Sequence, residues 1–314
     1  MIWLGWRQQR TETVITAALL GFVAAFLVPT GIEMAHAYAH DGLANCLGLN
    51  TGPACGDAVS AFELRFSKFT GLVGWFNLVP GLFGVVLAAP YVLELEHGTH
   101  RLAWTQSITR FQWVRAKLAL AITSTLVAAA ALIALYTWWR VPFVHLDGRM
   151  DNGAFDAQGT VVLGYALFAL GLALAVGAVW RRGIPAVLVS FVGYFVARIF
   201  VDTWLRQRFI APKQLTFSSG RGDPPALWHA WIISEGPSNA QGGPAVFPRG
   251  GCVAHAQHGF RATKACMASL GGHVHALFEP ASRFWALQGI ETALFAGVGV
   301  TLIAFAGWWT LRSE

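Results

Sequence analysis

Six apolar runs alternate with polar segments along the chain, and each run is long enough to cross a bilayer as a helix. A transmembrane helix needs about 20 mainly apolar residues. The pattern therefore predicts an all-α membrane protein with six transmembrane helices in one transmembrane domain, residues 1–314. The predicted spans are residues 14–30, 71–93, 118–138, 161–180, 184–204 and 284–308.

The first apolar run has two interpretations. Arg7 and Arg10 precede it, and Ala35-His36-Ala37 follows it, which is also the pattern of a cleavable signal peptide. Because five further apolar runs follow, we favour an uncleaved first span. Residues 31–70 then form the first predicted loop, and residues 205–283 form a long segment that is too polar to span.

The composition agrees with a membrane protein and excludes an ordinary soluble one. The chain is 55% hydrophobic and 12% charged, with a mean hydropathy of +0.51, whereas soluble domains carry about 25% charged residues. A net charge of +6 and a pI near 9.5 would suit a nucleic-acid partner. The bases lie beside the apolar runs, however, so the positive-inside rule explains them and we expect no nucleic acid.

The bases of the short loops predict the orientation. Bases concentrate in cytoplasmic loops, and segments longer than about 60 residues are not counted. With both termini in the cytoplasm, the long segment between spans five and six is extracellular and the loop between spans two and three is cytoplasmic. The cytoplasmic segments then hold Arg7, Arg10, Arg101, Arg110, Arg115, Lys117, Arg181, Arg182 and Arg312, against Arg65, Lys68, Arg140 and Arg149 in the short outer loops.

The four cysteines fall into two pairs, and both pairs lie outside the cell in this topology. Cys46 and Cys55 are in the first loop, and Cys252 and Cys266 are in the long outer segment. An oxidising compartment allows each pair to close a local disulfide, with free thiols as the alternative.

Three ionisable residues interrupt the fifth and sixth spans. Arg198 and Asp202 are separated by one helical turn, and Glu291 lies at a similar depth in the sixth span. Charges within a membrane usually pair with one another or line a cavity. We therefore weigh an ion pair of Arg198 with Asp202 or Glu291 against a polar patch on a substrate path or outer gate.

Histidines invite a metal hypothesis at two places. Glu33, His36 and His40 follow the first span with helical spacing, and the outer segment contains Cys252, His255, His258, Cys266, His273 and His275. Neither spacing matches a usual zinc site. We expect no bound metal, and the sequence contains no Ser/His/Asp set or Walker A pattern, so we do not expect an enzyme.

The stretch from Glu94 to Lys117 is polar, basic and rich in aromatics. Its pattern predicts a helix to about Trp104, a break with capping residues at Thr105-Gln106-Ser107, and a new helix from Ile108. One interpretation is an amphipathic connector that binds lipid headgroups.

The same stretch resembles a known motif. Glu94-x-Glu96-x-Gly98-Thr99, followed by Thr105 to Arg110 and by Lys117, is similar to the E-x-E-x-G-T…T-P-I-S-R…G-K loop of the permease subunit of ABC exporters of the second type (ABC-2). The T-Q-S-I-T-R-x-x-W form resembles an actinobacterial branch. Gln106-Ser107 stands where the family usually has a single proline.

The resemblance implies a function. In that family this loop forms the coupling helix, which docks on a separate ABC ATPase subunit. By position, the coupling residues here are Glu94, Glu96, Gly98, Thr99, Arg101, Thr105 and Arg110.

Cofactors and partners follow from the same resemblance. The chain would bind no cofactor itself, with ATP and Mg on the partner ATPase. It would pair with a second permease copy, as a homodimer, or with a paralogous permease, in a bacterial plasma membrane. The rival hypotheses are a membrane enzyme with an extracellular His/Cys metal site, and a non-transporting membrane scaffold or sensor.

Overall fold

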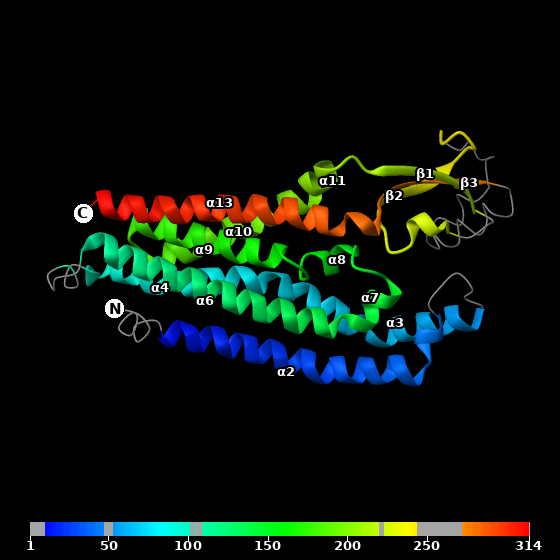
Figure 1. Cartoon of the computed structure of the whole chain (residues 1–314), viewed down its shortest axis with the longest axis horizontal. Helices are drawn as coiled ribbons and strands as arrows, with labels where there is room; N and C mark the ends of the chain where they lie inside the picture. Colours follow the sequence, from blue (N-terminus) through cyan, green and yellow to red (C-terminus); the bar gives the residue numbers. More distant parts are fainter. Residues whose placement is uncertain are drawn as a thin grey trace. The chain divides into compact units, whose positions relative to one another are not determined.

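The computed structural model describes residues 10–46, 53–100, 104, 109–219, 223–243 and 272–313. The chain divides into two compact units, which we call the helical unit and the sheet unit (Figure 1). The helical unit comprises Met1–Pro142, Phe155–Thr203 and Gln288–Glu314, and the sheet unit comprises Phe143–Ala154 and Trp204–Leu287.

The described residues contain six helical stretches that are long and apolar enough to cross a membrane, which confirms the predicted number of spans. These stretches are Arg10–His40, Cys55–Glu96, Arg110–Trp139, Val161–Trp180, Gly183–Phe209 and Ala281–Arg312.

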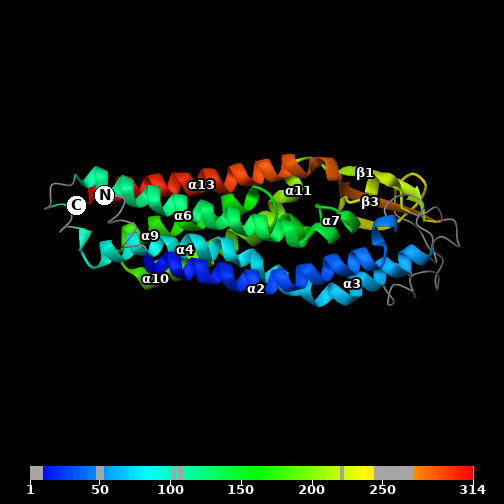
Figure 2. The ribbon, with the colours of Figure 1, turned by 60° about the horizontal axis from the view of Figure 1, so that its bottom comes forward.

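The long helices of the helical unit run alongside one another (Figures 1 and 2). The start of α2, the end of α4, the start of α6 and the end of α13 lie at one end of this bundle, which we call the terminal end. The helices are α2 (Arg10–His40), α4 (Val79–Glu96), α6 (Arg110–Trp139), α9 (Val161–Trp180), α10 (Gly183–Phe200) and α13 (Phe284–Arg312).

Helix α9 forms the core of the bundle. It is apolar on all sides, as expected of a helix surrounded by others, and it packs against α4, α6 and α10. Glycines allow backbones to approach closely. A Cβ added at Gly84 of α4 would lie 2.5 Å from the carbonyl oxygen of Ala166, and one at Gly171 would lie 2.5 Å from that of Gly299 in α13.

The predicted loop over residues 31–70 is largely helical, so that prediction was wrong. Helix α2 continues to His40, and a further helix, α3 (Pro53–Val73), precedes α4. Phe62 and Phe66 of α3 are buried one turn apart. Hydropathy averaging missed this helix because its apolar residues are interspersed with polar and charged residues such as Asp57, Arg65 and Lys68.

A break separates α3 from α4 just before Pro80. The 3₁₀ turn η2 (Gly74–Leu78) connects the two helices, and Pro80 lies in the first turn of α4. A first-turn N–H has no intrahelical partner, so proline costs little there.

Short elements also occupy the other connections: η1 (Leu43–Cys46), α7 (Val141–Leu146), α8 (Asn152–Phe155), the π-helical η3 (Val201–Leu205) and α11 (Arg206–Phe209).

The sheet unit contains strands, which the all-α prediction did not include. β1 (Lys213–Ser218), β3 (His273–Glu279) and β2 (Trp231–Ser238) form an antiparallel sheet in that order. Phe217, Val274 and Ala276 form its small core. In sequence, the 3₁₀ turn η5 (Pro225–Leu227) lies between β1 and β2, and η7 (Ala281–Arg283) follows β3.

Candidate functional site

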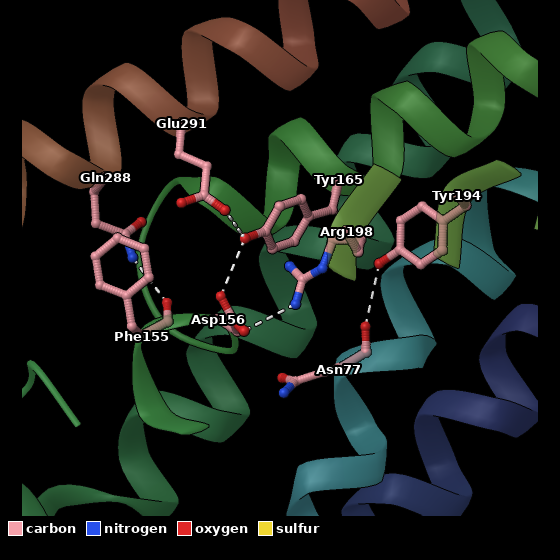
Figure 3. A network of polar contacts seen from close by, with 8 residues as sticks. All are labelled: Asn77, Phe155, Asp156, Tyr165, Tyr194, Arg198, Gln288 and Glu291. Carbon is pink, nitrogen blue, oxygen red and sulfur yellow. Dashed lines mark hydrogen bonds and ion pairs between the residues drawn. The ribbon is translucent and has the colours of Figure 1, made fainter. Parts of the chain in front are cut away.

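A network of polar side chains lies inside the helical unit, where the apolar spans would exclude water (Figure 3). Arg198 of α10 forms an ion pair with Asp156, and the distance from Nη2 to Oδ2 is 3.0 Å. Their side chains are only 10% and 8% exposed. Charges at such a depth are costly unless paired, so the ion pair is what allows both groups to be buried.

Tyr165 of α9 joins this ion pair to the last helix. The guanidinium of Arg198 lies over the Tyr165 ring, 3.6 Å from its centre, in a cation–π contact. The Tyr165 hydroxyl bonds to Asp156 Oδ1 at 3.2 Å and also to the carboxylate of Glu291 in α13 (Figure 3). One tyrosine therefore links groups from α9, α10, α13 and the turn before α9.

Gln288 fixes the turn that carries Asp156. Its side chain is fully buried, with its amide nitrogen donating to the carbonyl oxygen of Phe155 at 2.8 Å and its Oε1 accepting from the N–H of Val161 at 3.0 Å. A Cβ at Gly159 would lie 2.8 Å from Gln288 Oε1, so the turn reaches α13 only because that residue is glycine. The position of Asp156 is thus set by α13.

A cavity of about 420 Å³ borders the network where the α3–α4 break approaches α10. Tyr194 of α10 donates to the carbonyl oxygen of Asn77 in this break, at 3.2 Å. A Cβ at Gly81 would lie 2.5 Å from the Tyr194 ring, so glycine permits the contact. The polar side chains lining the cavity are Asn77, Asp156, Tyr194, Arg198 and Asp202.

The structure brings together two of the three ionisable residues that the spans pointed to. Arg198 and Glu291 meet through Tyr165, and Asp202 lines the adjacent cavity. Sequence reasoning missed Asp156, because it lies before an apolar run rather than within one. It also missed Tyr165 and Gln288, which read as ordinary residues of apolar helices.

The second candidate site is the connection between α4 and α6 at the terminal end. The Nζ of Lys117 in α6 lies 2.5 Å from Oε1 of Glu94, and the two side chains are 9% and 15% exposed. Oε2 of Glu96, the last residue of α4, accepts the N–H of Gly183 in α10 at 2.8 Å. Both acids of the motif are therefore bonded within the chain itself.

The turns on either side of the connection are well defined. Gly98 has a φ of +68°, which residues with a Cβ rarely adopt. Helix α6 has Thr109 as its N-cap, and a capping box joins Thr109 and Gln112 through bonds of 3.2 and 3.3 Å. Helix α4 ends at Glu96, so its predicted continuation to about Trp104 was wrong, and the N-cap of α6 is Thr109 rather than a residue of Thr105–Ser107. Arg101 and Thr105–Ser107 themselves lie outside the described residues.

Aromatic side chains tie this connection to three helices. The rings of Tyr91 in α4 and Trp113 in α6 stack with centres 5.5 Å apart, and the Tyr91 hydroxyl bonds to that of Thr310 in α13 at 2.7 Å. Arg110 lies over the ring of Trp104 at 4.8 Å. Thr99 and Arg110 are exposed, so they are available to a partner.

Of the predicted cysteine pairs, Cys46 and Cys55 are joined in a disulfide that ties η1 to α3, whereas Cys252 and Cys266 lie outside the described residues.

Glu33, considered as a metal ligand with His36 and His40, accepts a hydrogen bond from Arg65 at 3.0 Å. In the part of the chain that the structure describes, no group of three or more His, Cys, Asp or Glu residues is arranged to hold a metal. His255 and His258 also lie outside that part.

The six apolar helices of the described residues indicate a multi-pass membrane protein. The sequence profile of the family described as "ABC-2 membrane transporter related" matches residues 17–206, which is more than half of the chain. The chain therefore belongs to this family, and the resemblance to an ABC-2-type permease subunit is confirmed. Searches of curated proteins and of solved structures found no match.

Proposed function

We propose that this chain is the permease subunit of an ATP-driven exporter, and that a separate ABC ATPase drives it. The observation that carries the proposal is the polar connection between α4 and α6, which joins spans two and three of a family member at the terminal end of the bundle. The sequence has no G-x-x-x-x-G-K-[ST] pattern, so ATP and Mg would bind to the partner.

The connection between α4 and α6 is arranged to transmit a displacement that a partner imposes on it. Its two ends are held by the stacked Tyr91 and Trp113, the Glu94–Lys117 ion pair and the capping box of α6. A displacement at the exposed Thr99 and Arg110 would therefore move α4 and α6. Dimerisation of the ATPase on ATP binding would supply the displacement, and a bistable packing of the spans would convert it into inward- and outward-facing states.

The polar cavity beside Arg198 is the proposed part of the pathway within this chain. Irregular backbone at membrane depth is tolerated where it lines a cavity, and the η2 break borders this one. Two copies of the chain, or this chain and a paralogous permease, would enclose the pathway. The base distribution supports cytoplasmic termini in a bacterial plasma membrane, with the residues between α10 and α13 outside.

Gly98→Val tests the coupling role. Valine is strained at a φ of +68°, although nothing lies within 4 Å of the added Cβ, so the substitution distorts the turn without a clash. In proteoliposomes with the partner ATPase, we expect stimulation of ATP hydrolysis by this chain to fall roughly tenfold or more, since misplacement of a turn by about 1 Å can cost a hundredfold.

Gly21→Ala is the matched control, because its Cβ also meets nothing within 4 Å and its φ is ordinary. It should leave stimulation unchanged. The proposal is wrong if no ATPase co-purifies with the wild-type chain, or if Gly98→Val couples as well as the control.

A further inference from the structure

The carboxylate of Glu96 caps a helix that is distant in sequence. The first N–H groups of a helix have no intrahelical partner, and an acidic side chain there is also favoured by the helix dipole. In α10 the N-cap residue Arg182 has an extended backbone and makes no side-chain capping bond. Oε2 of Glu96 accepts the Gly183 N–H at 2.8 Å instead, and so supplies the missing cap from α4.

The local sequence makes room for this contact. A Cβ at Gly183 would lie 3.0 Å from Glu96 Oε2 and 3.2 Å from a methyl group of Leu93. A side chain there would therefore force the Glu96 or Leu93 side chain to shift by a few tenths of an ångström. Arg181, in the left-handed conformation with a φ of 53°, ends α9 and turns the chain directly into α10.

Helices α4 and α10 also meet at a second polar contact, the bond from the Tyr194 hydroxyl to the η2 segment that leads into α4. Beside the Glu96–Gly183 contact lies a cavity of about 460 Å³, lined mainly by apolar side chains such as Ala88, Val92 and Val187. A cavity between helices leaves fewer dispersion contacts to break when they shift. The Glu96–Gly183 bond therefore contributes to holding the end of α4 to the start of α10.

We propose that Glu96 is a positioning residue that latches the α4–α6 connection to α10, and that it acts as a hydrogen-bond acceptor within the permease rather than as a charge for the ATPase. This proposal rests on the coupling function proposed above and states how the motion of α4 would pass to α10. A shift at the end of α4 moves the first turn of α10. That helix carries Arg198 about 22 Å further along, at 1.5 Å per residue, into the polar network.

Two substitutions separate the latch from a direct charge contact with the ATPase. Glu96→Gln keeps an acceptor oxygen for Gly183 and loses the charge, whereas Glu96→Ala loses both. With the partner ATPase in proteoliposomes, we expect Glu96→Gln to stay within about twofold of the wild type. Glu96→Ala should lower stimulation roughly tenfold, the factor of a lost hydrogen bond to a charged acceptor, with the ATPase still bound. Equal defects in both variants, or normal coupling in Glu96→Ala, would overturn the proposal. Glu33→Gln, on α2, is the control carboxylate.

A second-site change separates the latch from a simple helix cap. Arg182→Ser places a capping side chain next to α10 itself. In the Glu96→Ala background it should restore the melting temperature but not the stimulation. Recovery of both would show that Glu96 only caps α10.

One measurement does not need the ATPase. Amide hydrogen exchange at Gly183 should be slow in the wild type and in Glu96→Gln, and faster in Glu96→Ala. If the wild-type chain stimulates no ATPase, the proposed function fails, and this exchange still decides the latch. Equal exchange in all three proteins would refute it.

Discussion

Two charged sites of the helical unit are held in different ways. Around Arg198, the ion pair with Asp156 is reinforced by the ring and the hydroxyl of Tyr165. At the terminal end, Glu94 bonds to Lys117, and Glu96 bonds to the Gly183 N–H at the start of another helix.

The difference is clearest at Glu96. This residue is exposed, so water can replace its contact with the Gly183 N–H when that contact breaks. The Glu94–Lys117 pair is nearly as buried as the Arg198–Asp156 pair, and a buried charge that loses its partner keeps its desolvation cost. We infer that the network around Arg198 is needed for folding as well as for any transport role, whereas the contact of Glu96 can change during a cycle.

The largest expected effect comes from removing one member of the buried ion pair. Asp156→Ala leaves the guanidinium of Arg198 without its 3.0 Å partner. Breaking a buried pair in this way costs about 3–5 kcal/mol, so the free energy of unfolding in mixed micelles should fall by that amount and the yield of folded protein should drop.

A second change checks the cause. In the Asp156→Ala background, Arg198→Met removes the stranded charge and keeps an apolar stem, so stability should largely return. If Asp156→Ala alone is harmless, or if Arg198→Met does not help, the network is not held by this ion pair and the contrast between the two sites disappears.

A smaller loss is expected at Gln288, which has no charge. Gln288→Leu leaves the Val161 N–H and the Phe155 carbonyl without their bonds at 3.0 and 2.8 Å. Unsatisfied buried polar groups cost about 1–3 kcal/mol, and we expect a loss of unfolding free energy in that range. Thr301→Val is the control on the same helix, because its exposed hydroxyl bonds only to its own helix at Gly297. Equal stability of both variants would mean that the Asp156 turn does not depend on α13.

The sequence was a good guide to the spans and a poor one to the segments between them. Hydropathy detects a span because the bilayer demands a long apolar run. It does not detect α3, whose stability comes from an apolar stripe with Phe62 and Phe66. It also missed the sheet, where only alternate residues such as Leu215 and Phe217 face the small core. Such alternation over a short strand is easily hidden among the Lys, Gln and Ser of β1.

For the sites, the sequence could identify charges that are out of place but not their partners. Arg198 and Glu291 stood out because an apolar run makes any charge conspicuous. Asp156 did not, since in a polar loop an aspartate is ordinary, and only the fold brings it beneath Arg198. In the same way, the motif drew attention to Glu96, but its spacing could not show that this carboxylate turns toward α10.

The smallest expected effect is that of Glu94→Gln. The amide oxygen of the variant can still accept from the Lys117 ammonium, so only the charge is lost from a pair that is 15% and 9% exposed. Since hydrogen bonds contribute about 1 kcal/mol and the bond is retained in weaker form, the free energy of unfolding should fall by about 1 kcal/mol or less. Thermal melting in detergent would measure it beside Asp156→Ala. A loss as large as that of Asp156→Ala would mean that the terminal end is as rigid as the buried network, and it could not then act as the part that moves.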